Sequence, residues 1–332
     1  MSARSDRSPA PDLAALRAGP ASRRAWRKYW ITDPLYGGLD HLLHAAMPLM
    51  GVDGASTFGA ALARRSIPRH HPDWLERADA ALASLRPELD VAARTDIIDR
   101  RHAAIGRVMA EFPVLRRMAE QDRIAVEGAA RLNDALADDA PVILAALHLG
   151  NWEVSMLPSV LRRLAGLQAP MRPVHVIYQP PRSRFRHRLA VRARERSGAT
   201  LLPPGRPAGM AAMQVLRARG IVWMALDDYR DRQVNGPLFG RAAGRRGNLG
   251  VAVRLAAATG ARIVPLYVVR ENGANFTLHV GPEPDDWPHR RQAARAGDLA
   301  PAVAALNARV ERPVLDHLDQ WFMLHELRLP AA

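Results

Sequence analysis

The second half of the chain alternates short apolar runs with helical stretches, and this alternation limits the fold more than any other feature. The apolar runs, rich in β-branched residues, lie at 141–147, 174–178, 199–203, 221–226, 262–269 and 275–280. Helical patterns occupy about 154–166, 183–197, 207–219, 248–259 and 300–321. Strand and helix in alternation are typical of a layered α/β domain. We therefore predict an α/β domain over 139–328, with a mainly parallel central sheet flanked by helices.

The part of the chain before this domain has a different composition. Residues 1–25 are rich in Ser, Pro and Arg with little apolar periodicity, so we expect a mobile basic N-terminus. They lack the continuous apolar core of a secretory signal, so export is not expected. We predict a helical N-terminal region over 26–138, within which 96–119 shows apolar residues at spacings of three and four.

Within this helical region, 34–65 is the most apolar segment of the N-terminal third. A membrane-spanning helix needs about 20 mostly apolar residues, and Asp40, His41, His44 and Asp53 interrupt the segment. We therefore predict an interfacial helical hairpin that acts as a membrane anchor. The expected lipid-facing residues are Leu35, Leu39, Leu42, Leu43 and Met47.

Cations and aromatic rings flank this segment. Arg27, Lys28, Arg64 and Arg65 are placed to meet anionic lipid headgroups, and Trp26, Tyr29 and Trp30 to lie at headgroup level. A soluble helix pair packed on the domain is the alternative, and the sequence leaves it open.

Composition excludes several classes of function. The chain has no cysteine, so disulfides, cysteine zinc sites and thiol nucleophiles are absent. Lys28 is the only lysine, so no GxxxxGK[ST] phosphate loop exists. The net charge of +14 is almost entirely arginine, which favours acidic partners such as lipid headgroups, an acidic carrier protein or nucleic acid. A general bias toward Arg, Ala, Pro and Gly explains the same charge equally well.

The strand at 141–147 ends in the sequence HLGNWE, which spans 148–153. Ligands of open parallel sheets collect at the carboxyl ends of strands, where His148 is expected. Gly150 suits a tight turn, and Asn151 suits the cap of a helix that holds Glu153 in its first turn. Across such a turn, we expect the Glu153 carboxylate to hold one imidazole nitrogen while the other accepts a proton. A capped loop histidine is the structural alternative.

This pair lacks a nucleophile from the protein itself, because we find no GxSxG elbow and the chain has no cysteine. The chemistry that needs only a histidine base is direct acyl transfer, in which the imidazole deprotonates an acceptor hydroxyl that attacks an acyl thioester. Backbone N–H groups at the helix start, or an arginine, would stabilise the oxyanion.

HLGNWE resembles the HxxxxE motif of the bacterial lipid A biosynthesis acyltransferases, the lauroyl and myristoyl transferases. Other stretches resemble this family in the same order, at 189–204, 221–231, 236–244, 250–270 and 320–328. The resemblance covers about 26–328 and implies a glycerol-3-phosphate-acyltransferase-like fold. The chain departs from close relatives at Tyr178-Gln179-Pro180, where they have Tyr-Arg-Pro, and at the Asp227-Asp228 pair, where many have Asp-Gln or Asp-His.

The resemblance implies a role for each matching residue. It makes His148 the general base and Glu153 its orienting partner. Arg194 is the candidate contact to a thioester or phosphate, with Arg192 second, and Asp227 is a further acidic site residue; we add Asn151 to the substrate-binding set. Several of the seven arginines between 182 and 196 could instead only solvate a helix face, and Asp227 could cap a turn.

The implied activity is O-acyl transfer from an acyl carrier protein or coenzyme A thioester to a lipid A-like glycolipid or other membrane lipid. The implied location is the cytoplasmic face of a bacterial inner membrane, with single-anchor or peripheral attachment. We expect no cofactor and no metal, since no HExxH occurs, and no nucleic acid partner, since no aromatic residues interleave a basic recognition helix. A catalytically silent lipid-binding protein of the same fold is the alternative.

Overall fold

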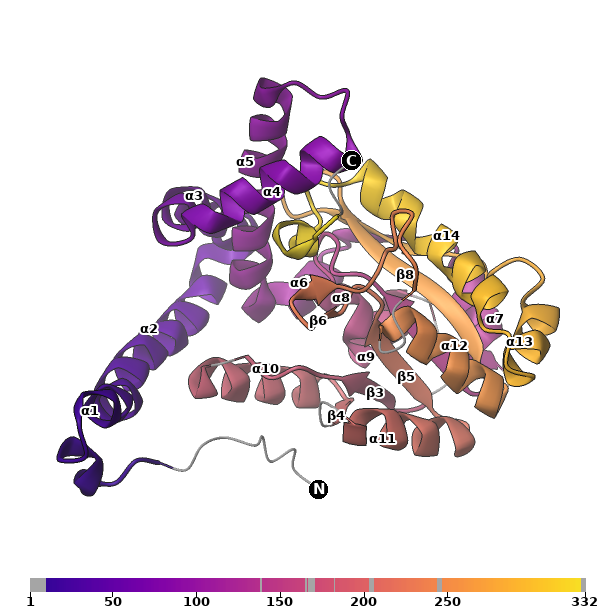
Figure 1. The fold of residues 1–332 in the computed structure, drawn as a ribbon, viewed down its shortest axis with the longest axis horizontal. Helices are drawn as coiled ribbons and strands as arrows, with labels where there is room; N and C mark the ends of the chain where they lie inside the picture. The colour runs from indigo at the N-terminus through magenta and orange to yellow at the C-terminus, as the bar shows by residue number, and fades with distance from the viewer. Residues whose placement is uncertain are drawn as a thin grey trace.

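A seven-stranded sheet forms the centre of the computed structural model, which describes residues 10–137, 139–164, 166, 171–181, 183–202, 206–243 and 247–329 (Figure 1). The strand order is β1-β9-β8-β2-β5-β3-β4, and every neighbouring pair is parallel except β8 and β9. The strands are β1 Ile124–Glu127, β2 Val142–Ala146, β3 Val174–Ile177, β4 Ala199–Leu202, β5 Ile221–Ala225, β8 Arg262–Arg270 and β9 Phe276–Val280. The predicted mainly parallel α/β sheet is confirmed.

Six of these strands coincide with the six apolar runs of the sequence. Strand β1 was not expected, because its four residues lie within the region that reads as helical. A separate antiparallel hairpin, β6 Tyr229–Arg230 with β7 Gln233–Val234, follows the end of β5.

Helices cover both faces of the sheet, and the buried side chains of β2 show why. Ile143 and Ala145 face one apolar core, whereas Val142, Leu144 and Ala146 face the other, as the two-residue period of a strand requires. The first core is closed by α11 Arg206–Arg217, α12 Asn248–Thr259, α13 Trp287–Arg295 and α14 Ala300–Asp316. The second is closed by α6 Leu115–Glu120, α7 Ala129–Ala137, α8 Glu153–Met156 and α9 Pro158–Leu164.

Two helical predictions differ in detail from the structure. The stretch predicted over 154–166 divides into α8 and α9 around Leu157, whose backbone is extended, because Pro158 disfavours a helical conformation in the residue before it. The last helix, α14, ends at Asp316, and the chain continues through a turn into the 3₁₀ helix η5 Phe322–Glu326. Helix α13 was not predicted.

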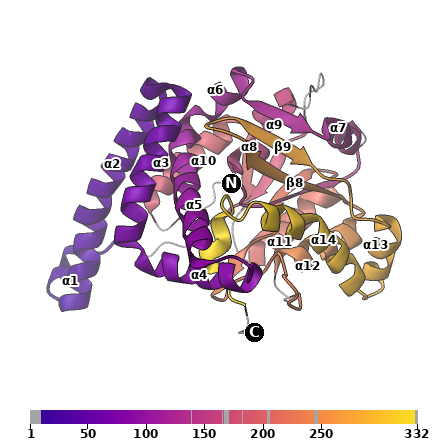
Figure 2. The ribbon, with the colours of Figure 1, turned by 90° about the horizontal axis from the view of Figure 1, so that it is seen from above.

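The N-terminal region is mostly helical, as predicted, and lies beside the α/β domain (Figure 2). Its elements are η1 Leu13–Leu16, α1 Pro20–Arg27, η2 Lys28–Thr32, α2 Asp33–Ala46, η3 Met47–Met50, α3 Gly51–His70, α4 Pro72–Leu85, α5 Val91–Glu111 and η4 Phe112–Val114. Residues 1–9 of the expected mobile N-terminus lie outside the described residues, whereas 10–25 contain η1 and most of α1.

Helix α3 packs along α5, and two glycines permit their close approach. A methyl group on Gly59 would lie 2.4 Å from the carbonyl oxygen of Gly106, and one on Gly106 would lie 2.1 Å from the carbonyl oxygen of Gly59. Any side chain at either position would therefore push the helices apart. This contact fixes α5, whose last residue is Glu111, against α3.

Helix α2 packs instead on α10 Arg184–Arg196. Gly37 lies against the ring of Phe185, and Asp40 accepts two hydrogen bonds from Arg186. The segment predicted as an interfacial hairpin thus consists of two helices with different packing partners, α10 for α2 and α5 for α3.

One side of α2 and its flanks is apolar and exposed. Ile31, Leu35, Leu39, Leu42 and Leu49 follow helical spacing and are 48%, 70%, 50%, 66% and 88% exposed. We call these five residues the apolar stripe. Leu43 and Met47, which we also expected on this face, turn inward: Met47 is buried in the second core and Leu43 packs against it. None of the helices in the described residues has both the length and the hydrophobicity needed to cross a membrane.

Candidate active site

His148 lies at the carboxyl edge of the sheet, two residues beyond β2. The neighbouring strand β5 is in parallel register with β2, pairing Ala146 with Ala225, and two residues beyond it lies Asp227. The Nδ1 atom of His148 is 2.8 Å from Oδ1 of Asp227, and the backbone N–H of His148 donates to Oδ2 at 2.8 Å. Because a buried carboxylate accepts hydrogen bonds, Nδ1 carries the proton and Nε2 is the basic nitrogen.

The C-terminal segment completes this pair. The indole Nε1–H of Trp321 donates to Oδ2 of Asp227 at 2.9 Å, and both side chains are 0% exposed. The backbone of the same segment pairs with residues 147–152, between β2 and α8, which we call the histidine loop. Gly150 N–H donates to the carbonyl of Gln320 at 3.3 Å, and Phe322 N–H donates to the carbonyl of His148 at 2.9 Å. His148 is thus held by its main chain as well as by its ring.

The charge balance around His148 favours its protonated form. Burial lowers the pKa of His148, but the charge and hydrogen bond of Asp227, together with the charge of Glu153, outweigh burial and raise the pKa above 6.5. The side chain is 26% exposed, so a substrate can approach it. An imidazole with a fixed tautomer, a carboxylate on Nδ1 and an accessible edge has the parts of a general base.

The structure differs from the sequence in the carboxylate that holds the imidazole. Glu153 is in the first turn of α8, as predicted, and is 5% exposed, but its hydrogen bonds come from Nε of Arg194 at 3.2 Å and from Nη2 of Arg194. Arg194 offers Glu153 two charged donors, whereas Asp227 lies on the neighbouring strand end, beside the imidazole. Asp227 therefore takes the position that we expected Glu153 to take, and Glu153 acts on His148 through its charge.

Arg194 is 8% exposed and reaches inward from α10. Its guanidinium carbon lies 4.8 Å from the centre of the Tyr178 ring. Burial lowers the pKa of Arg194, but Glu153 and Tyr178 outweigh this effect and raise it. We expected the Arg194 guanidinium to face the substrate, but in the structure it is paired with Glu153. Arg192, on the same helix, is exposed to solvent.

Asn151 also differs from its expected role. Its side chain is 0% exposed, and Nδ2 donates to Oε2 of Glu111 at 2.9 Å. Helix α8 begins at Glu153 with Trp152 at its cap position, and no side-chain hydrogen bond caps it. The structure thus places the Asn151 side chain in an internal polar cluster and not at the cap of α8.

Sequence reasoning missed two residues that support the site, Trp321 and Arg101. Trp321 lies in the stretch 320–328, and the resemblance of this stretch to the family was the one signal for it. Arg101, on α5, is fully buried and donates to the carbonyls of Trp321 at 2.9 Å and Phe322 at 2.6 Å. Burial lowers the pKa of Arg101 to about 9, so it stays charged at neutral pH. A helical arginine 220 residues away from its acceptor leaves no local pattern in a sequence.

Asp228, beside Asp227, belongs to a different set of contacts. Its Oδ1 accepts from the backbone N–H of Asn248 at 2.8 Å, at the start of α12, and its Oδ2 is 3.4 Å from Nδ2 of Asn235. Burial raises the pKa of Asp228 to about 6. Asp228 therefore fixes the helix behind the site and does not contact His148. In the described part of the chain, no three His, Asp or Glu side chains form a group that could hold a metal ion.

Comparison with known proteins identifies the family of the chain. A search of curated proteins found no match. The family model of the bacterial lipid A biosynthesis acyltransferases matches residues 22–329, which include the helical N-terminal region, the sheet, His148, Asp227 and Trp321. The chain belongs to the bacterial lipid A biosynthesis acyltransferase family.

Proposed function

We propose that the protein is an O-acyltransferase that moves a fatty acyl chain from an acyl thioester to a hydroxyl of a lipid A-like glycolipid or another membrane lipid. The observation that carries this proposal is the His148–Asp227 pair, at 2.8 Å, with the imidazole partly accessible at the carboxyl edge of the sheet. Membership of the acyltransferase family supports the same chemistry.

In the proposed reaction, Nε2 of His148 takes the proton of the acceptor hydroxyl as its oxygen attacks the thioester carbonyl. The tetrahedral intermediate collapses with cleavage of the carbon–sulfur bond, and the imidazolium returns the proton to the departing thiolate. Asp227 stabilises the imidazolium formed between these steps, and the charge of Glu153 adds to that effect. General-base assistance of this kind contributes about 10²- to 10⁴-fold in rate.

For the acyl donor, we propose acyl carrier protein or coenzyme A, held by the exposed face of α10. Arg188, Arg192 and Arg196 recur every four residues on this helix and are exposed. Such a row of guanidinium groups can bind phosphates or the carboxylates of an acidic carrier. The same helix carries Arg194 on its buried side, next to Glu153, so a donor bound here would lie near His148.

For the acceptor, we propose delivery from the cytoplasmic face of the bacterial inner membrane, with the apolar stripe of α2 lying in the interface. Exposed Arg27 and Lys28 precede the stripe, Trp30 beside it is 49% exposed, and Arg64 and Arg65 are exposed on α3. Apolar residues flanked by cations and an aromatic ring are typical of helices that lie on anionic membranes.

The test is a comparison of total lipids and lipid A by mass spectrometry, from cells that make the wild-type protein or the His148→Ala variant. We expect a species heavier by one fatty acyl group only with the wild type, and its mass would identify the acyl chain and the acceptor together. A species of equal abundance with the variant would refute the role of His148. No new species with either protein, in hosts that supply several lipid acceptors, would favour a silent lipid-binding protein of the same fold.

A further inference from the structure

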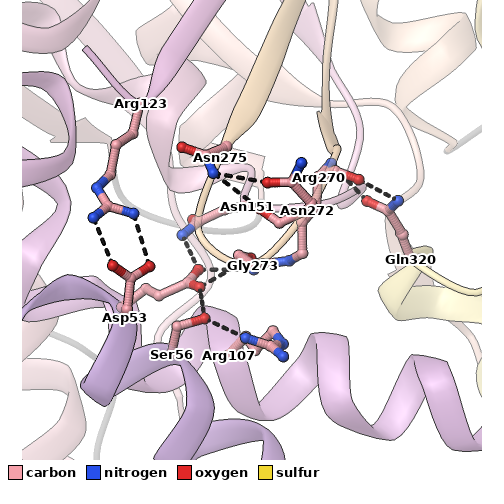
Figure 3. Close-up of polar contacts among 11 residues, drawn as sticks. Asp53, Ser56, Arg107, Arg123, Asn151, Arg270, Asn272, Gly273, Asn275 and Gln320 are labelled. Atoms are coloured by element: carbon pink, nitrogen blue, oxygen red, sulfur yellow. Dashed lines mark hydrogen bonds and ion pairs between the residues drawn. The ribbon is translucent and has the colours of Figure 1, made fainter. Parts of the chain in front are cut away.

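A second group of polar side chains lies under the histidine loop, outside the His148–Asp227 pair. We call Ser56, Arg107, Glu111, Asn151 and Arg270 the Glu111 cluster. Its centre is the carboxylate of Glu111, which ends α5 and is 0% exposed. Ser56 on α3, Asn151 on the histidine loop and Arg270 at the end of β8 all donate to this carboxylate; these three residues are labelled in Figure 3.

Glu111 accepts four hydrogen bonds from described residues. Arg270 donates from Nη1 to Oε1 at 2.6 Å and from Nη2 to Oε2 at 2.8 Å. Ser56 donates to Oε1 at 2.6 Å and Asn151 to Oε2 at 2.9 Å, while Arg107 donates to the hydroxyl of Ser56 at 2.6 Å. A buried carboxylate is stabilised when its lone pairs accept further hydrogen bonds besides the ion pair, and Ser56 and Asn151 provide these bonds for Glu111.

Asn151 is the member of the Glu111 cluster that belongs to the histidine loop. The loop lies tightly over β8, because Gly150 has a φ of +54° and a methyl group there would lie 2.2 Å from the carbonyl oxygen of Val268. On one side of Gly150, the backbone of His148 is bound by Phe322; on the other, the side chain of Asn151 is bound by Glu111. The loop is thus fixed at both ends.

The C-terminal segment is tied to the same cluster. The side chain of Gln320 accepts from the backbone N–H of Arg270 at 2.8 Å and donates to the carbonyl of Arg270 at 3.0 Å (Figure 3). Arg270 therefore connects Glu111 with the segment whose Trp321 binds Asp227. Arg270 thus contacts both groups that hold the histidine loop, the Glu111 cluster and the C-terminal segment.

We propose that Glu111 is a positioning residue, which acts through Asn151 to hold His148 in register with Asp227 and with the acceptor hydroxyl. Glu111 does not touch the reacting atoms. This inference rests on the proposed function for its rate effect, but the position of the His148 ring can be measured without any substrate. A displacement of a reacting group by about 1 Å can cost about 10²-fold in rate, so we expect the loss to fall on kcat more than on KM.

The first test is Asn151→Asp in the full-length protein. The new carboxylate would face Glu111 in place of an amide donor, and two carboxylates at this distance share one proton and titrate with one strongly raised pKa. We expect kcat to fall by at least about tenfold at pH 8. We also expect the ratio of variant to wild-type kcat to recover as the pH falls, because a proton between the two carboxylates restores the hydrogen bond.

The second test exchanges the two groups in a Glu111→Gln, Asn151→Asp double variant. Its amide at 111 can donate to the carboxylate at 151, so this hydrogen bond returns with reversed direction and the total charge is unchanged, while the bond that Oε2 of Glu111 accepts from Nη2 of Arg270 is lost. We expect the double variant to regain a large part of the kcat that Asn151→Asp loses. The matched control is Asp53→Asn, which breaks an exposed two-bond pair with Arg123 beside the cluster (Figure 3) and should leave kcat unchanged.

A measurement without substrate separates this inference from the proposed function. With ¹⁵N-histidine labelling, and the His148 signals assigned from His148→Ala, we expect the ring shifts and titration of His148 to change in Asn151→Asp and to return in the double variant. If the wild type transfers no acyl group, the proposed function fails and this spectrum still decides the role of Glu111. Unchanged His148 signals with unchanged kcat in Asn151→Asp would overturn the inference. Should that variant not fold, Asn151→Ala replaces it, and wild-type kcat and His148 signals there would overturn it equally.

Discussion

Replacing Asp227 by Asn should remove catalysis while changing the shape of the site very little. Among the described residues, Asp227 accepts three hydrogen bonds, and two of them, from the backbone of His148 and from Trp321, converge on Oδ2. They will keep the asparagine oxygen at that place, so its NH₂ group will face Nδ1 of His148. Nδ1 must then accept a hydrogen bond, and the proton moves to Nε2. The nitrogen that should receive the acceptor's proton is blocked.

The expected magnitude follows from this change of tautomer. The same substitution in a serine protease triad costs about 10⁴-fold in kcat, which corresponds to about 5.5 kcal/mol in the barrier. Stability should change less. Hydrogen bonds to a charged group contribute about 1.5–3 kcal/mol and neutral ones about 0.5–1.5 kcal/mol, so a loss of about 1–3 kcal/mol is expected and the protein should remain folded at 25 °C.

The assay is the pH dependence of kcat/KM, with Glu153→Gln as the comparison and Asp228→Asn as the matched control. In the wild type, activity should rise with pH as His148 loses its proton, with the midpoint above 6.5. In Asp227→Asn the midpoint should move to lower pH, because the charge that raised the pKa of His148 is gone. Wild-type kcat in Asp227→Asn, together with a large loss in Glu153→Gln, would refute the reasoning and restore Glu153 as the orienting residue.

Three further predictions concern the buried pair, the second aspartate and the apolar stripe. Arg194→Ala leaves the Glu153 carboxylate buried and unpaired, so the free energy of unfolding in urea should fall by about 3–5 kcal/mol; a loss below about 1 kcal/mol would contradict the pairing. Because the pKa of Asp228 is raised to about 6, the folded wild type loses stability as the pH rises through 6. The stability of Asp228→Asn relative to wild type should therefore increase by about 1.5 kcal/mol between pH 5 and 7.5. A stability difference that stays constant over this range would contradict the pKa shift. Serine at Leu35, Leu39 and Leu42 should lower binding to anionic phospholipid vesicles by at least about tenfold, since each buried leucine contributes about 1.5–3 kcal/mol; undiminished binding would contradict the interfacial role.

Much of the fold could be predicted from local sequence patterns. The strands of the sheet after residue 140 are apolar, and all but β8 and β9 are separated by helical stretches. This periodicity depends only on neighbouring residues. Strand β1 could not be found in this way, because IAVE at 124–127 is brief and half exposed. Its place beside β9 depends on a partner 152 residues later, with Ile124 opposite Phe276.

The residues of the site could be predicted from the sequence, but not which of them form hydrogen bonds with each other. Sequence spacing places Glu153 near His148, and no local rule indicates that β5 lies beside β2 and brings in Asp227 from 79 residues away. Strand order decides that contact. The same limit applies to the five residues of the Glu111 cluster, which come from α3, α5, the histidine loop and β8. It also applies to Leu43 and Met47, because an apolar side chain suits a protein core as well as a membrane.

The most direct test of the proposed chemistry is thiol release by the purified protein from an acyl thioester, with and without an acceptor lipid. Because the proposed nucleophile is the acceptor hydroxyl, activated by His148, we expect thiol release only when the acceptor is present. The amount of thiol released should equal the amount of acylated lipid formed. Both amounts should be greatly reduced in His148→Ala. A burst of thiol release without acceptor, with an added acyl mass on the protein, would place the nucleophile on the enzyme and contradict direct transfer.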